Sequence, residues 1–180
     1  MTPYRVLAYA PLLALLCWAA VQDVRTRRIR NWLTFSLALC GLAQSFAPNP
    51  TVGPLDAALG LLTGFALTVP LFAIGALGGG DVKLMAAIGA WLGPWPALQV
   101  FLGRAVVGMV IVLCQAGMAG RLRLLLRNTA VLAVQLLHLR ELGVQHVEAS
   151  GRTCRSIDRP LPFAVPVLAT TLVVLYVYLR

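Results

Sequence analysis

Six segments of the sequence carry no charged side chain, and each is long enough, or nearly so, to cross about 30 Å of hydrocarbon. They are residues 6–22, 31–55, 57–80, 84–103, 105–120 and 160–179. Apolar residues make up 59% of the chain and charged residues 12%, whereas charged residues are roughly a quarter of an ordinary soluble domain. We therefore predict an all-α fold, a polytopic membrane helical bundle of about six transmembrane helices, with residues 1–180 forming one domain.

Proline and glycine indicate where two of these segments are interrupted. The second helix is expected to end near 48–50, where Pro-Asn-Pro stops a helix, and the fourth is broken by Gly-Pro-Trp-Pro at 93–96. The fourth helix is then expected to have only about a dozen residues, which is shorter than a full crossing.

The positions of the arginines predict the orientation of the helices in the membrane. Four of them lie between residues 25 and 30, and most of the others lie in the long segment 120–159. Because basic loops stay on the cytoplasmic side, we expect cytoplasmic loops at approximately 23–31, 78–83 and 120–159, with both termini outside. Residues 128–139 either lie at the interface or form a short additional span.

The net charge of +9 does not indicate nucleic-acid binding, because the basic residues are divided among loops that flank apolar helices. Contact with anionic lipid headgroups explains them better. Arg104 falls between two predicted spans, and we expect its side chain to snorkel to the interface.

Two of the six acidic residues lie at predicted membrane boundaries on the same side. Asp23 closes the first apolar span, and Asp81 follows three glycines in the segment 77–83, LGGGDVK. A carboxylate in such a place is a functional-site candidate, because its desolvation is costly. Two carboxylates close together can share a proton, so that one acts as general base on a water molecule while the other stays protonated. This is the chemistry of aspartyl peptide hydrolysis.

Residues around Asp81 suit such a site. Gly78 and Gly80 permit unusual backbone angles and the close approach of an extended substrate. Lys83, the one lysine of the chain, lies two positions after Asp81, where it can hold a nearby negative charge or snorkel to the interface. The four cysteines contain no CxxC pair, so neither a zinc site nor a redox motif is indicated.

Three stretches resemble the type IV prepilin peptidases, a family of GxGD aspartyl proteases. The segment 78–84 (GGGDVKL) and the helix that follows look like the family's GxGDxK segment. The segment 23–31 (DVRTRRIRN) is similar to the first-aspartate loop, with Asp23 and Asn31 in register and Arg30 where proline is usual. The segment 159–166 (RPLPFAVP) resembles the proline-rich start of the last helix, with Ala164 where glycine is common.

The resemblance implies specific roles. Asp23 and Asp81 would be the catalytic dyad, supported by Gly78, Gly80, Lys83 and Asn31 near the substrate. The enzyme would cut the basic leader from prepilins or pseudopilins at the cytoplasmic face of the bacterial inner membrane, with no metal or organic cofactor. The chain looks like the short, peptidase-only form of Flp/Tad-type pilus systems, so N-methyltransferase activity is not predicted.

Other functions remain open from the residues alone. An intramembrane protease of the presenilin or signal-peptide-peptidase type would use the same chemistry. A small transporter or proton channel also uses membrane aspartates, although usually nearer the midplane. In a non-catalytic assembly factor of a pilus or secretion apparatus, Asp23 would balance the arginine loop and Asp81 would cap a helix start.

Overall fold

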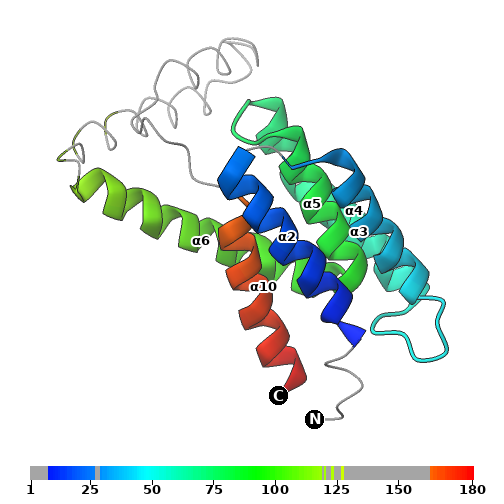
Figure 1. The fold of residues 1–180 in the computed structure, drawn as a ribbon. Helices are drawn as coiled ribbons and strands as arrows, with labels where there is room; N and C mark the ends of the chain where they lie inside the picture. The colour runs from blue at the N-terminus through cyan, green and yellow to red at the C-terminus, as the bar shows by residue number, and fades with distance from the viewer. Residues whose placement is uncertain (1–7, 27–28, 119, 121–122, 124–126, 128–162) are drawn as a thin grey trace.

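The computed structural model describes residues 8–26, 29–118, 120, 123, 127 and 163–180, and these residues form helices and connecting loops without any strand (Figure 1). The helices are α2 (Ala10–Thr26), α3 (Asn31–Gln44), α4 (Pro54–Ala73), α5 (Gly79–Leu92), α6 (Pro94–Met118) and α10 (Ala164–Leu179). The predicted all-α class is confirmed for this part of the chain. The segment 128–139 lies outside the described residues, as does most of the predicted loop 120–159.

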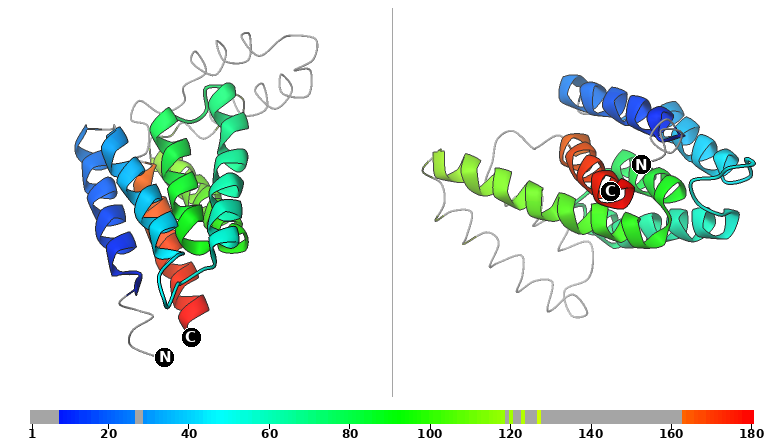
Figure 2. Two further views of the ribbon diagram at one scale, coloured as in Figure 1. Left: turned by 90° about the vertical axis from the view of Figure 1, so that its right-hand side faces the viewer. Right: turned by 90° about the horizontal axis from the view of Figure 1, so that it is seen from below.

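Helix α5 forms the centre of the bundle. Every residue from Leu84 to Leu92 is buried, because α5 packs against α4, α3 and α6. Helix α10 packs against α6 and α2 and completes the other side of the bundle (Figure 2). Since α5 has neighbours on several sides, its first turn is held in place relative to the ends of α2 and α10.

Helices α4 and α5 approach so closely that only glycine fits at their contact. A Cβ atom built on Gly64 would overlap the backbone carbonyl of Met85, and one on Gly60 would overlap that of Gly89. Small residues allow helix backbones to come together in membrane proteins, where packing rather than the hydrophobic effect drives association. The register of α5 is therefore fixed by its contact with α4.

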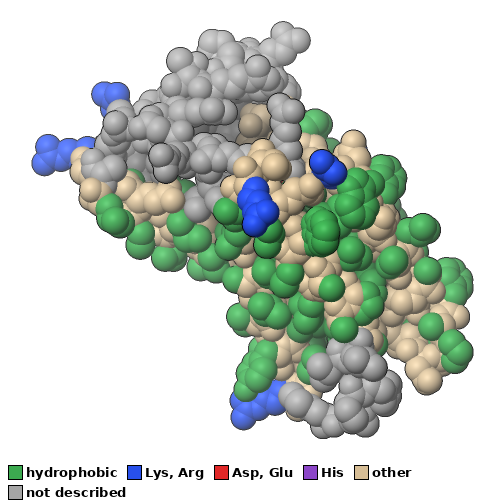
Figure 3. Space-filling model, in the orientation of Figure 1, with side chains coloured by type: hydrophobic (Ala, Val, Ile, Leu, Met, Phe, Trp, Pro, Cys, Tyr) green, Lys and Arg blue, Asp and Glu red, His purple; other side chains and the backbone are tan. Residues whose placement is uncertain are grey.

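Two described helices, α4 and α6, are long and apolar enough to span a membrane, with 20 and 25 residues, and α10 is a shorter apolar helix. Large apolar side chains remain exposed on the outside of the bundle, among them Val106, Met109, Leu172 and Val173. Hydrophobic side chains spread over the visible helices in Figure 3, whereas the visible Lys and Arg side chains lie near the helix ends. This distribution is that of a helical membrane bundle.

One predicted boundary is wrong. The sequence placed Arg104 between two spans, but α6 runs without interruption from Pro94 to Met118, with Arg104 in its interior. The break lies instead at Gly93, whose φ of 84° ends α5 directly before Pro94. The expectation of a short helix before this break is correct, since α5 has 14 residues. A charged residue does not mark the end of this span, because the fold accommodates the Arg104 guanidinium inside α6.

Alternating chain direction brings three helix ends together. The end of α2, the start of α5 and the start of α10 lie toward the same end of the bundle, whereas the start of α2 and the end of α10 lie at the other (Figure 1). Asp23 lies within the last turns of α2 rather than in the loop that follows. Asp23 and Asp81 are thus brought to one end of the bundle.

Candidate active site

Asp23 is a buried carboxylate held by the start of a distant helix. Its side chain is 5% exposed, and its Oδ2 atom accepts a hydrogen bond of 2.8 Å from the backbone N–H of Ala164. Ala164 is the first residue of α10, where backbone N–H groups lack partners within the helix. The positive end of the helix dipole also favours a negative charge there. Helix α10 therefore both orients the Asp23 carboxylate and stabilises its charge.

Asp81 lies in the first turn of α5 and is partly buried. Its Oδ2 atom accepts a hydrogen bond of 3.0 Å from the backbone N–H of Gly78. This contact caps the start of α5, because the Gly78 N–H precedes the helix and has no helical partner. The capping bond uses one carboxylate oxygen and fixes the side-chain orientation.

The two aspartates act on each other electrostatically. Asp81 lies in the connection between predicted spans and outside the two candidate spans, α4 and α6. Burial raises the pKa of its carboxyl to about 6, and the charge of Asp23 acts in the same direction, whereas the Gly78 N–H and the charge of Arg104 oppose the rise. A carboxyl with a pKa near neutrality can both accept and release a proton at physiological pH.

Glycine at position 80 lets the loop after α2 lie against the start of α5. A Cβ on Gly80 would stand 3.3 Å from the Cβ of Ile29, which is tighter than most real contacts. A Cβ on Gly78 would stand 3.3 Å from Oδ2 of Asp81. Gly80 therefore lies beside the loop that follows α2, and Gly78 lies beside the Asp81 carboxylate.

Lys83 and Asn31, two further residues singled out from the sequence, contact each other. The Nζ atom of Lys83 donates a hydrogen bond of 3.0 Å to Oδ1 of Asn31, and it lies 5.6 Å from the centre of the Phe35 ring. Lys83 is exposed, so this contact is open to water. It joins the second turn of α5 to Asn31, the first residue of α3.

Arg104 is a functional candidate that the sequence reasoning missed. Its charge acts on Asp81, and its guanidinium carbon lies 3.9 Å from the centre of the Phe163 ring and 5.9 Å from that of Phe101. Phe163 directly precedes Ala164, the donor to Asp23. The available signal was a single charged residue within 25 residues of helix sequence, which in a membrane segment indicates a partner.

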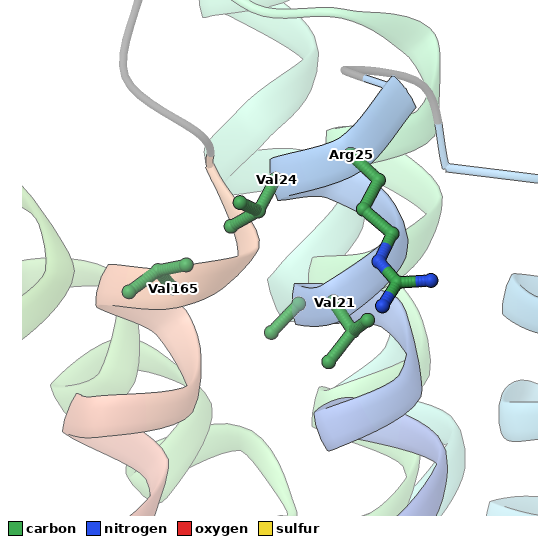
Figure 4. A pocket seen from close by; sticks show the side chains of 5 residues that line it. Val21, Val24, Arg25 and Val165 are labelled. Atoms are coloured by element: carbon green, nitrogen blue, oxygen red, sulfur yellow. The ribbon is translucent and has the colours of Figure 1, made fainter.

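A small groove lies beside this end of the bundle, between the last turns of α2 and the start of α10 (Figure 4). It is lined by Ala20, Val21, Val24, Arg25 and Val165, which neighbour Asp23 and Ala164 in the sequence. The lining is mostly apolar and carries none of the carboxylates discussed above. Among the described residues, no cluster of histidine, cysteine and carboxylate side chains has the arrangement of a metal site.

A family model described as the type IV leader peptidase family matches residues 10–113, which contain both aspartates, Asn31, Lys83 and Arg104. The chain belongs to the type IV leader peptidase family. The resemblance of the GGGDVKL segment to this family is thereby confirmed, since the match covers more than half of the chain.

Two curated relatives of this leader peptidase family member are named prepilin leader peptidase/N-methyltransferase. The protein of Pectobacterium carotovorum is 37% identical over 115 residues, 59% of this chain and 40% of the relative. That of Klebsiella pneumoniae is 38% identical over 95 residues, 48% of this chain and 40% of the relative. The chain thus matches less than half of either relative's length. The search of solved structures gave no significant match.

Proposed function

We propose that this member of the type IV leader peptidase family is an aspartyl endopeptidase, with Asp23 and Asp81 as its catalytic pair. The observation that carries the proposal is that these two carboxylates, from α2 and α5, lie at one end of the bundle, where the charge of Asp23 acts on Asp81. Neither carboxylate is neutralised by direct contact with an arginine or lysine that the structure describes.

The proposed reaction is hydrolysis of a peptide bond by a pair of carboxyl groups that share one proton. The ionised carboxylate removes a proton from a water molecule, whose oxygen attacks the peptide carbonyl carbon, while the protonated carboxyl donates its proton to the carbonyl oxygen. The carbon–nitrogen bond then breaks as the carbonyl re-forms. The amine leaves with the proton that was taken from water, and a hydroxyl of the gem-diol returns a proton to the other carboxylate, which restores the singly protonated pair. We do not assign the shared proton to one aspartate, since coupled groups titrate as a pair.

The proposed substrates are type IV or Flp-type prepilins and pseudopilins, cut at the cytoplasmic face of the inner membrane. Such a substrate presents basic residues followed by an apolar helix. A dyad at the end of a membrane bundle meets that junction directly. The names of the two curated relatives support this substrate class. We propose the leader peptidase activity alone, because paired carboxylates supply the chemistry of hydrolysis rather than of methyl transfer.

The glycines and the Lys83–Asn31 contact have supporting roles in this proposal. Gly78 keeps the space directly beside the Asp81 carboxylate free of a side chain, so that an extended peptide backbone can approach it, whereas Gly80 admits Ile29 against the start of α5. The hydrogen bond between Lys83 and Asn31 holds the start of α3, and with it the loop that leaves Asp23.

A second candidate function rests on the capping contacts. Each aspartate accepts a backbone N–H at the start of a helix, Asp23 at α10 and Asp81 at α5, which is also what a purely structural carboxylate does. A non-catalytic assembly factor of a pilus or secretion apparatus would use them in this way. The two candidates differ in what a charge-neutral substitution does, because asparagine keeps an oxygen that accepts the same hydrogen bond.

Leader cleavage of a co-expressed prepilin, read as a shift in gel mobility, tests the proposal. We expect cleavage by the wild type, none by Asp23→Asn or Asp81→Asn at equal protein levels, and normal cleavage by Asp56→Asn. Asp56 is the matched control, because it lies in the first turn of α4 at the opposite end of the bundle. Cleavage by either dyad variant, or none by the wild type across several prepilins, would favour the assembly factor.

A further inference from the structure

Arg104 lies in the interior of α6, where a charge is costly unless a partner compensates it. It is the one charged residue between Pro94 and Met118. Its side chain is partly buried rather than directed into open lipid. The expectation that this arginine simply snorkels to the interface therefore leaves its surroundings unexplained.

The surroundings of Arg104 connect it to both aspartates. The guanidinium carbon lies 3.9 Å from the centre of the Phe163 ring, a distance at which a cation is attracted by the ring face. The next residue, Ala164, donates its N–H to Asp23. The charge of Arg104 also acts on Asp81 and opposes the effect of Asp23. At the start of α10, Phe163 thus contacts the Arg104 cation, and the next residue, Ala164, binds the Asp23 carboxylate.

The contact between α6 and α10 fixes this arrangement. A Cβ on Gly103 would stand 3.0 Å from Cγ2 of Thr170, so the α6 backbone lies directly against α10 one residue before Arg104. The Thr170 hydroxyl also lies 3.5 Å from the carbonyl oxygen of Val100, within hydrogen-bond range. Arg104 therefore projects from a part of α6 that cannot slide along α10 without disturbing these contacts.

We propose that Arg104 is a positioning residue that sets the charge balance of the Asp23–Asp81 pair, held for that purpose against the Phe163 ring. The proposal rests on the proposed function for its catalytic meaning. A cation beside two carboxylates reduces their mutual repulsion, so that the pair releases its proton at a lower pH than it would without the cation. Without Arg104, the Asp81 carboxyl holds its proton to higher pH, so that a smaller fraction of it is ionised and able to accept a proton at neutral pH.

The charged groups around Asp81 are few in the described part of the chain. Helix α2 contributes Asp23 and α6 contributes Arg104. Lys83, on the same helix as Asp81, is hydrogen-bonded to an asparagine. Helices α3 and α10 carry no charged residue within their bounds, and α4 carries only Asp56, in its first turn at the far end. Substitution of Arg104 thus removes the described cation whose charge acts on Asp81.

The first test measures the Asp81 carboxyl directly, without reference to activity. The full chain contains four aspartates, so selective ¹³C labelling gives four side-chain carboxyl signals in lipid nanodiscs, and Asp81→Asn assigns one of them. We expect the titration midpoint of Asp81 to rise by about one pH unit in Arg104→Gln and to stay unchanged in Arg104→Lys. Arg25→Gln is the matched control, because Arg25 is an exposed arginine at the same end of the bundle.

A second variant tests the role of the ring. Phe163→Leu keeps the apolar bulk and the arginine but removes the attraction between cation and ring, so we expect a smaller shift in the same direction. This variant also serves if Arg104→Gln fails to accumulate in the membrane. Equal midpoints in the wild type, Arg104→Gln and Phe163→Leu would overturn the proposal, as would an equal shift in Arg25→Gln.

The pH dependence of leader cleavage separates the two proposals. We expect the acidic limb of the profile to move to higher pH in Arg104→Gln, with kcat lowered more than KM is raised, and to return in Arg104→Lys. If the wild type cleaves normally but Arg104→Gln changes neither the pH profile of cleavage nor the Asp81 titration midpoint, the proposed role of Arg104 fails and the peptidase function stands. If the Asp81 titration midpoint shifts in Arg104→Gln but the wild type cleaves no prepilin, the charge coupling stands and the proposed function fails.

Discussion

The backbone N–H of Ala164 donates a 2.8 Å hydrogen bond to Oδ2 of Asp23, although 141 positions separate the two residues. This bond makes the start of α10 part of the candidate active site. The Asp23 side chain is 5% exposed, so a buried carboxylate there without such a donor would be unfavourable. The start of α10 therefore compensates part of the cost of burying the Asp23 side chain.

Replacement of Asp81 by asparagine should stabilise the fold above neutral pH. Burial raises the pKa of this carboxyl from 3.8 to about 6, so its stabilising contribution is complete below 3.8 and is lost as the pH rises through about 6. Asparagine carries no charge and can still accept from Gly78. We expect Asp81→Asn to exceed the wild type in unfolding free energy by at most ~3 kcal/mol at high pH.

Unfolding in mixed micelles of increasing denaturing detergent, repeated across pH, measures this difference. The gap between variant and wild type should close as the pH falls to about 4, where both side chains are neutral. A gap that does not change with pH would show that ionisation of Asp81 has no part in the stability of the fold.

Alanine at position 80 should impair cleavage more than alanine at position 79. A Cβ on Gly80 would stand 3.3 Å from the Cβ of Ile29, whereas one on Gly79 meets its nearest atom, in Phe72, at an ordinary 3.7 Å. We expect Gly80→Ala to displace the loop after α2 and to slow cleavage about tenfold. Gly79→Ala is the control and should retain most activity. Equal rates for the two variants would contradict the close approach of Ile29 to Gly80.

Lys83 and Asn31 should show measurable coupling. Their side chains share a 3.0 Å hydrogen bond that is open to water. In a double-mutant cycle with Lys83→Met and Asn31→Ala, we expect a coupling free energy of about 1 kcal/mol in unfolding. If the two single effects simply add in the double variant, the hydrogen bond contributes nothing to stability, and the proposed support for the loop after Asp23 is lost.

Alanine at position 64 should damage the bundle itself. Its Cβ would overlap the carbonyl of Met85 where α4 and α5 meet. Since backbone cannot move aside as a side chain does, we expect Gly64→Ala to lower the unfolding temperature strongly and to reduce the amount of protein in the membrane. Gly108→Ala should leave both unchanged, because a Cβ there has nothing within 4 Å. Normal accumulation of Gly64→Ala would contradict the observed approach of α4 to α5.

The helix pattern and the family were predictable because their signals are local. Uncharged apolar segments predicted the helical membrane bundle, and Gly93 before Pro94 predicted the end of α5. The flanks of Asp23 and Asp81 matched the family that the comparison then established. Each of these inferences depends on residues next to one another in the sequence.

The contacts between distant residues of the site could not be predicted from local sequence patterns. The bond from Ala164 to Asp23 depends on the packing of α10 against α2, which no local pattern encodes. Arg104 was misplaced because charge was taken as the boundary of a span, whereas the Phe163 ring and the charge of Asp81 allow it to remain within α6. The missed features are those in which distant residues compensate a charge.

The most direct test of the central claim asks whether Asp23 and Asp81 act as one unit. The measurement is the leader-cleavage rate of purified full-length protein in lipid, for the two single asparagine variants, the double variant and Asp56→Asn. If the carboxylates form one catalytic pair, each single variant falls to the background rate of the double variant, because residues that act together are strongly non-additive. Asp56→Asn keeps the wild-type rate. Residual cleavage in either single variant that disappears only in the double variant would contradict the account.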